Sequence, residues 1–330
     1  MSSELSIQPY SESMEKEWDA LVLQSSVNGT FLQTRNFLNY HPEGRFVDAS
    51  VVIKRGDKII AVFPACEICG ESGKEIVSHK GSTYGGVIIE KKQYSAESVI
   101  NIIMLLDEYF KERYKKVTMK ITTDIHSVES SDLLQYALEY TGYSSYVELN
   151  TYIDLLDLQD DVTANFDRNK KRNIKKCEEH GLYFRSLENK EEIESFYRLL
   201  CINLSKYDLK PIHTIDEILE LAYKRVPNNI KFYGVFKDMD MMAGGMMFAF
   251  DNVNVIHAQN LSADYRFEDY SPITFLYYSV IRQARVDGYK ALTWGISTED
   301  EGRKLNLGLI RNKESYGSKY QLNRTFYKIY

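Results

Sequence analysis

The chain has few cysteines, few histidines and no metal-binding spacing of either. Four cysteines in 330 residues are too few for a disulfide framework. Cys66 and Cys69 form a lone C-x-x-C, and zinc needs four ligands, so we expect neither a metal nor a redox role for this pair. The six histidines form no H-x-x-H or H-x-x-x-H pair, and the sequence therefore predicts no metal site.

Long apolar runs and an excess of positive charge are also missing. No stretch approaches the roughly 20 apolar residues that a membrane-spanning helix requires. The N-terminal residues lack a basic region followed by an apolar core, so we expect no signal peptide. A net charge of −6 argues against non-specific coating of nucleic acid, and we expect no DNA partner. These absences predict a cytoplasmic protein, free or attached peripherally at the inner face of the membrane.

The composition is that of a folded globular protein: 44% of the residues are hydrophobic and 27% are charged. A length of 330 residues favours two domains, each able to bury its own core. The same order of predicted elements occurs twice along the chain. In the first half, periodicity and turn signals predict strands over 5–10, 48–55, 58–66, 116–121 and 145–149, with helices over 12–24, 96–114 and 131–140.

The second half repeats this order after a boundary near 150–163, where an extended strand gives way to Asp-rich, loop-like sequence. One helix there opens with Ser271 as N-cap and Pro272 at its first position. The remaining pattern predicts strands over 182–187, 230–237, 242–250, 253–261 and 290–294, with helices over 190–204 and 214–225.

The last forty residues carry the most specific pattern. A short strand ends at Trp294-Gly295, a polar and acidic loop follows, and Lys313 stands three residues before Tyr316-Gly317. Between them, apolar residues recur at 305, 307, 309 and 310. This run resembles the C-terminal signature of the FemABX-type acyltransferases, a branch of the GNAT (general N-acetyltransferase) superfamily, in which a strand-end turn precedes a "gl..fK..fG" segment.

The resemblance implies an α/β (α+β) chain of tandem GNAT-like domains, each with a mixed, mostly antiparallel twisted sheet flanked by helices. The domains would span 1–152 and 153–330, with the final strand, 319–330, returning to the first. The implied activity is transfer of an acyl or aminoacyl group to an amino group of a cell-envelope precursor of the polysaccharide or peptidoglycan type. The sequence has no room for the helical-hairpin insertion that one aminoacyl-tRNA-dependent subgroup carries.

Three residues are candidates for the chemistry. Lys313 matches the family's motif lysine and would stabilise developing negative charge, and we expect it to contribute little to packing. The aromatic residue that usually precedes it is Asn312 here. His257 stands where the family often has a tyrosine and is the candidate proton acceptor, with Glu299 as its competitor. The alternative for His257 is a half-buried strand residue without a catalytic role.

A basic run at 167–176 is the first candidate for substrate binding. Arg172, Ile174 and Lys176 match a family helix that holds the phosphates of a nucleotide-sugar or lipid-linked acceptor, with Arg168 and Lys171 nearby. Positions 168, 172 and 176 share one helix face, and arginine offers forked donors suited to phosphate. The alternative is an ordinary solvated helix face.

The first half supplies further candidates for acceptor binding. His41 ends a segment that resembles the family's "f.Qs..W...K" pattern, at the position where a lysine is frequent. Lys80 and Tyr84 flank or lie within a Gly-rich loop, 81–86, whose backbone amides could approach an anionic ligand. A surface histidine and a bulged strand end are the alternatives.

The acyl donor and partners remain open at this point. Acetyl-CoA enzymes of the superfamily hold the pyrophosphate with glycines before a helix, whereas the stretch 262–272 contains none. The resemblance leaves acyl-CoA, acyl carrier protein and aminoacyl-tRNA as donors, and a small-molecule or lipid-linked sugar or peptide as acceptor. Two other functions stay open: a non-catalytic protein that binds envelope sugars or peptides, and an RNA-binding module that uses the basic helix.

Overall fold

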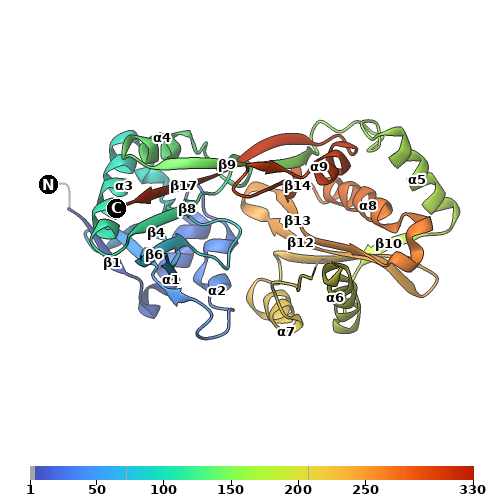
Figure 1. Cartoon of the computed structure of the whole chain (residues 1–330), viewed down its shortest axis with the longest axis horizontal. Helices are drawn as coiled ribbons and strands as arrows, with labels where there is room; N and C mark the ends of the chain where they lie inside the picture. The colour runs from blue at the N-terminus through green and yellow to red at the C-terminus, as the bar shows by residue number, and fades with distance from the viewer. Residues whose placement is uncertain (1–3, 72, 207) are drawn as a thin grey trace. The chain divides into compact units, whose positions relative to one another are not determined.

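The computed structural model describes residues 4–71, 73–206 and 208–330, and the chain divides into two compact units (Figure 1). Unit 1 comprises Met1–Glu148 and Leu322–Tyr330, and unit 2 comprises Leu149–Gln321. The chain passes from one unit to the other within two strands, β9 (Ser144–Asp154) and β17 (Lys319–Ile329). The residues of unit 2 are therefore inserted between two segments of unit 1.

Unit 1 contains a four-stranded sheet in the order β1-β3-β4-β7 and a second group of strands in the order β9-β17-β8-β6-β5-β2. In the second group β8 runs parallel to β6 and antiparallel to β17. The strands are β1 (Leu5–Pro9), β2 (Val47–Asp48), β3 (Val51–Arg55), β4 (Lys58–Phe63), β5 (Ala65–Gly70), β6 (Gly73–Ser78), β7 (Ile88–Ile89) and β8 (Lys116–Lys120).

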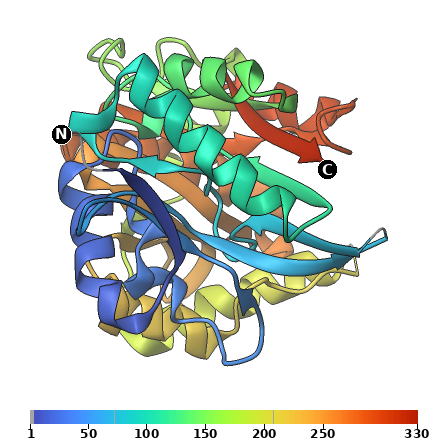
Figure 2. The same ribbon diagram turned by 90° about the vertical axis from the view of Figure 1, so that its left-hand side faces the viewer.

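Helix α3 covers the core of unit 1, as its apolar periodicity predicts. It spans Ala96–Lys111 and buries Val99, Ile102, Ile103 and Leu106 against strand residues of the same core. Figure 2 shows α3, in teal, lying across these strands. The other α-helices of the unit are α1 (Glu15–Ala20), α2 (Arg35–Leu38) and α4 (Asp132–Tyr140).

Unit 2 contains strands in the order β10-β11-β12-β13-β14-β9. These strands pair antiparallel except β13 and β14, which are parallel. Its elements are α5 (Arg168–Glu179), β10 (Tyr183–Ser186), α6 (Lys190–Ser205), α7 (Ile215–Glu220), β11 (Ile230–Lys237), β12 (Asp240–Phe250), β13 (Val255–Ala263), α8 (Pro272–Val286), β14 (Ala291–Ile296), β15 (Thr298–Glu299), β16 (Lys304–Leu305) and α9 (Leu307–Glu314).

Helices cover both faces of the unit 2 strands, with α8 on one face and α6 and α7 on the other (Figure 1). Pro272 is the first residue of α8, as predicted. Leu276, Val280 and Ile281 of α8 pack against Ile256 and other strand residues in one core. The mixed, mostly antiparallel sheets flanked by helices confirm the predicted fold class.

The largest departure from the predicted elements lies in unit 1. The strand predicted over 58–66 ends at Phe63, because Pro64 has no N–H to continue the ladder. A new strand, β5, begins at Ala65 and contains both Cys66 and Cys69. Its hairpin partner β6 was not predicted. The helix predicted over 12–24 is present as consecutive helical turns that include α1.

Candidate active site

The parallel pairing of β13 with β14 ends early, and this feature defines the candidate site. The two strands pair from Val255 and Ala291 to His257 and Thr293. Beyond that row, β13 continues along β12, whereas β14 continues to Ile296, which pairs with β9. The facing edges of β13 and β14 are therefore not paired with each other past His257 and Thr293.

A bulge in β13 lies just past this point. Met246 faces Asn260 and Met247 faces Ala258, so Gln259 is the extra residue. A bulge twists a strand and redirects the side chains that follow it, and bulges are frequent next to active sites. Here it begins two residues after His257.

His257 is a neutral, enclosed histidine at the last paired row. It is 7% exposed, and its Nδ1 lies 2.7 Å from Thr293 Oγ1. Burial, with a contribution from the positive charge of Lys313, lowers the pKa of His257 to about 4. Gly295 has φ +76°, a backbone conformation that favours glycine, and a Cβ there would make an ordinary contact with His257 Cε1, at 3.5 Å. A neutral imidazole in this position can accept a proton.

Lys313 is buried rather than exposed in a cleft, so the expectation that it contributes little to packing is wrong. The residue is 4% exposed, on α9. Its Nζ donates to the carbonyl oxygens of Gly295 (2.8 Å) and Ile296 (2.9 Å) and to Ser297 Oγ (2.9 Å). Burial lowers the pKa of Lys313 to about 8. The ammonium thus ties α9 to the end of β14, one strand away from His257.

Glu299 lies in a different environment from His257. It belongs to the exposed β15–β16 hairpin, where its carboxylate accepts from Lys304 Nζ (2.6 Å) and Asn306 Nδ2 (3.3 Å). The hydrogen bond and charge of Lys304 lower the pKa of Glu299, which weakens it as a proton acceptor. Asn306 also caps α9, so Glu299 belongs to the surroundings of the helix that carries Lys313.

The basic run forms the predicted helix, α5, and its three candidate residues share the solvent-facing side. Arg168, Arg172 and Lys176 are exposed, while Ile174 and Cys177 face the core. Lys176 Nζ donates to the carbonyl oxygen of Asp269 (2.7 Å).

Sequence reasoning passed over Lys170, which points the other way. Its Nζ donates to Asn312 Oδ1 (2.8 Å) and lies 4.6 Å from the centre of the Tyr316 ring. Burial lowers the pKa of Lys170. Position 170 stands four residues before Ile174 and seven before Cys177, and this apolar spacing was the available signal.

The first-half candidates lie in unit 1 and are described there alone. The His41 ring stacks on that of His79, with centroids 5.7 Å apart and planes at 12°, and Phe46 packs edge-on against both. Lys80 is exposed. Tyr84 is 2% exposed and packs against His126, so its ring offers no open surface to a substrate in this structure.

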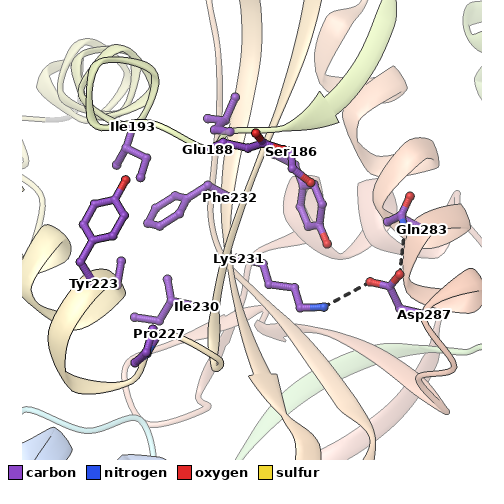
Figure 3. A pocket seen from close by; sticks show the side chains of 13 residues that line it. Ser186, Glu188, Ile193, Tyr223, Pro227, Ile230, Lys231, Phe232, Gln283 and Asp287 are labelled. Carbon is purple, nitrogen blue, oxygen red and sulfur yellow. Dashed lines mark hydrogen bonds and ion pairs between the residues drawn. The ribbon is translucent and has the colours of Figure 1, made fainter.

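Figure 3 shows another pocket of unit 2, of about 420 Å³. Its charged groups bind each other: Lys231 Nζ lies 3.3 Å from Asp287 Oδ2, and Gln283 donates to the same carboxylate. Tyr223 and Ile193 lie on the other side of Phe232 (Figure 3). Because its cation and anion neutralise each other, we assign no chemistry to this pocket.

Within the described residues, no three His, Cys, Asp or Glu side chains are grouped as metal ligands would be. Cys66 is buried and Cys69 exposed, and burial raises the pKa of the Cys66 thiol. None of the helices in the described part of the chain is long and apolar enough to cross a membrane.

Comparisons with known proteins show similarity to one family model and to several solved structures. Residues 164–302 match the family model described as an acetyltransferase (GNAT) domain. No curated protein sequence matches the chain. Among solved structures, FemX is similar with a TM-score of 0.72 at 11% identity, covering 98% of this chain and 97% of FemX.

Two further structures share the fold. One is the C-terminal domain of a putative lysylphosphatidylglycerol synthetase from Agrobacterium fabrum, with a TM-score of 0.61 at 10% identity, covering 96% of this chain and 92% of that one. The other is a tandem GNAT protein from the clavulanic acid biosynthesis pathway, with a TM-score of 0.55 at 9% identity, covering 99% and 98%.

Proposed function

We propose that this chain, whose residues 164–302 match a GNAT-domain model and whose fold is similar to that of FemX, transfers an acyl or aminoacyl group to an amino group of a cell-envelope precursor. The acceptor would be a small or lipid-linked sugar or peptide. The observation that carries the proposal is the neutral, buried His257 beside the charge of Lys313, where β13 and β14 part. The names of FemX and of the putative lysylphosphatidylglycerol synthetase support the aminoacyl and envelope parts.

In the proposed reaction, the acceptor nitrogen attacks the carbonyl carbon of the donor. The N–C bond forms as the carbonyl π pair moves to oxygen, and the tetrahedral intermediate then expels the thiolate or alkoxide of the donor. His257 takes the proton that the nitrogen loses. Nε2 is the accepting atom, because Nδ1 is already positioned by Thr293 Oγ1. With a pKa of about 4, His257 is neutral near pH 7, so Nε2 carries a lone pair for the proton, while the same shift makes the imidazole a weak base.

Lys313 acts in this proposal without touching the reacting atoms. Its positive charge lies close enough to lower the pKa of His257, and the same field would stabilise the developing oxyanion. Its hydrogen bonds to Gly295 and Ile296 fix the edge of β14. We therefore treat Lys313 as a positioning residue.

The segment that precedes α8 provides evidence on which acyl donor the protein uses. It is filled by a 3-10 helix, Tyr265–Tyr270, in which Glu268 and Asp269 are exposed. Carboxylates and the missing glycines make this a poor pyrophosphate site. We propose acyl carrier protein or aminoacyl-tRNA as the donor in preference to acetyl-CoA.

A direct transfer assay tests the proposal. Purified protein would be mixed with acetyl-CoA, acyl carrier protein thioesters or charged tRNA, and with amino-sugar nucleotide or peptide precursors, and the acceptor mass measured. We expect transfer from at least one donor and a loss of about 10²–10⁴ in rate for His257→Gln. His180→Gln, an exposed histidine of the same unit, is the matched control. Absence of transfer from every donor, or full activity in His257→Gln, would contradict the assignment.

A further inference from the structure

We propose that unit 2 holds the apolar side chain of the transferred acyl group in a pocket between α6, the α6–α7 loop and β13. This inference rests on the proposed function and names its substrate class. The cavity measures about 290 Å³. Leu200, Leu204 and Ile218 form its aliphatic lining, and Gln259 and Asn260 of β13 close its polar end.

The pocket opens on the same face of the sheet as His257. Ile256 and Ala258 belong to the core under α8, so His257, between them, points to the opposite face, where α6 lies. The bulge at Gln259 shifts the alternation by one residue. Leu261 then returns to the α8 core, which leaves Asn260 on the α6 face with His257. The polar end of the pocket, at Gln259 and Asn260, is thus separated from the proposed proton acceptor, His257, only by the bulge in β13.

The loop over the pocket leaves apolar side chains in water. Leu209 is 56% exposed and Ile212 is 82% exposed, although both line the cavity. The loop is anchored at both ends: Leu209 N donates to the carbonyl oxygen of Leu204 (3.1 Å), and Tyr197 Oη donates to that of His213 (3.1 Å). Exposed apolar groups held above an aliphatic floor gain stability when a ligand's apolar chain covers them.

The shape and chemistry of the pocket select the class of acyl group. Apart from Lys210 and His213, the loop and helix residues that line it are aliphatic, so a charged side chain would lose its hydration without a partner. An acetyl or glycyl group would leave most of the volume empty. The carbonyl lies at the Gln259 end and the chain runs toward Ile218. A medium-length aliphatic acyl group or an apolar aminoacyl group fits this arrangement.

Binding of simple carboxylates tests the pocket without requiring turnover. Acetate, butyrate, hexanoate and octanoate would be titrated into the full chain by calorimetry. We expect each added methylene to tighten binding by up to about fourfold until the cavity is filled. Ile212→Asp should remove most of this gain, and because Ile212 is 82% exposed, folding should be unaffected. Val286→Asp, at a 76% exposed position of α8, is the matched control.

A second variant and a transfer arm complete the test. Leu204→Trp should fill the cavity and abolish octanoate binding while acetate binding stays the same. Equal affinity for acetate and octanoate, or equal losses in Ile212→Asp and Val286→Asp, would overturn the pocket even if transfer activity is found. Small acyl thioesters and amines of increasing length would then be compared in the transfer assay. A length preference that follows the amine and not the acyl group would overturn the assignment to the donor.

Discussion

At the scale of single residues, the buried lysine is the feature that most changes the chemistry. Lysine is rarely enclosed without a charged partner. Lys313 instead donates to two backbone carbonyls and the Ser297 hydroxyl, and its burial lowers its pKa to about 8. The pKa of His257 is also lowered, to about 4, because burial and the charge of Lys313 both disfavour the imidazolium. Because of these two pKa shifts, His257 is neutral and Lys313 is charged between about pH 4 and about pH 8.

This pair predicts a bell-shaped dependence of kcat on pH. Below a pH of about 4, His257 is protonated and cannot accept a proton, and above about 8, Lys313 loses its charge, so activity should fall on both sides. Initial rates at saturating substrate, measured from about pH 3 to about pH 10, would show both limbs. Lys313→Arg keeps its charge throughout and should lose the alkaline limb. If activity of Lys313→Arg still falls near pH 8, a group other than Lys313 is responsible for the alkaline limb.

At the scale of elements, local patterns predicted most of the longer helices and strands, but contacts between distant segments decided the site. The stripe of α3 and the Ser271-Pro272 start of α8 are set by neighbours in sequence, so they could be read directly. The meeting of His257 with Thr293 depends on a parallel register between strands 36 positions apart, which no local spacing encodes. The burial of Lys313 depends in turn on the carbonyls at the end of β14.

The leucines that precede Lys313 lie largely at the surface. Leu305, Leu307 and Leu309 are 42%, 55% and 37% exposed, and only Ile310 of the four apolar residues in this segment is buried. The short β16 strand and the start of α9 present these leucines outward. Their exposure is set by the hairpin that precedes α9, not by the periodicity of the segment itself.

Helix α5 provides a matched comparison between its two faces. Lys170→Met removes the hydrogen bond to Asn312 and should lower stability by about 1 kcal/mol and slow transfer by disturbing α9. Arg172→Met should leave the unfolding temperature unchanged and raise the acceptor KM by about tenfold, because an arginine–phosphate bond is lost. Thermal unfolding and steady-state kinetics of both variants separate the roles. An unchanged KM in Arg172→Met would leave that side of α5 as a plain solvated surface.

At the scale of the whole molecule, each unit encloses a histidine whose pKa lies far below its ordinary value. His79 in unit 1 and His257 in unit 2 both have a pKa of about 4, with burial as the main cause. Electrostatic interactions with His41 and Arg35 lower the pKa of His79 further, while Asp48 raises it. The folded chain therefore binds fewer protons than the unfolded chain between about pH 4 and pH 6.5.

The sign of this difference makes the protein less stable as the pH falls through that window. Each histidine should contribute a loss of up to about 1.4 kcal/mol per pH unit below its unfolded pKa of about 6.5. Urea unfolding at pH 7, 6 and 5 would measure it. His79→Gln and His257→Gln should each flatten the dependence, while His180→Gln should not. If the free energy of unfolding depends on pH with the same slope in the wild type and in all three variants, groups other than His79 and His257 are responsible.

The insertion of unit 2 between two segments of unit 1 sets an order for events on the ribosome. Residues 322–330 supply most of β17, which pairs with β8 and buries Phe326 in the core of unit 1. These residues are translated after the whole of unit 2. The unit that is begun first is therefore completed last. Until residues 322–330 have been added, one edge of β8 has no neighbouring strand, whereas the strands of unit 2 have already been translated. A released chain truncated after residue 321 should be cleaved by protease in unit 1 and resist cleavage in unit 2.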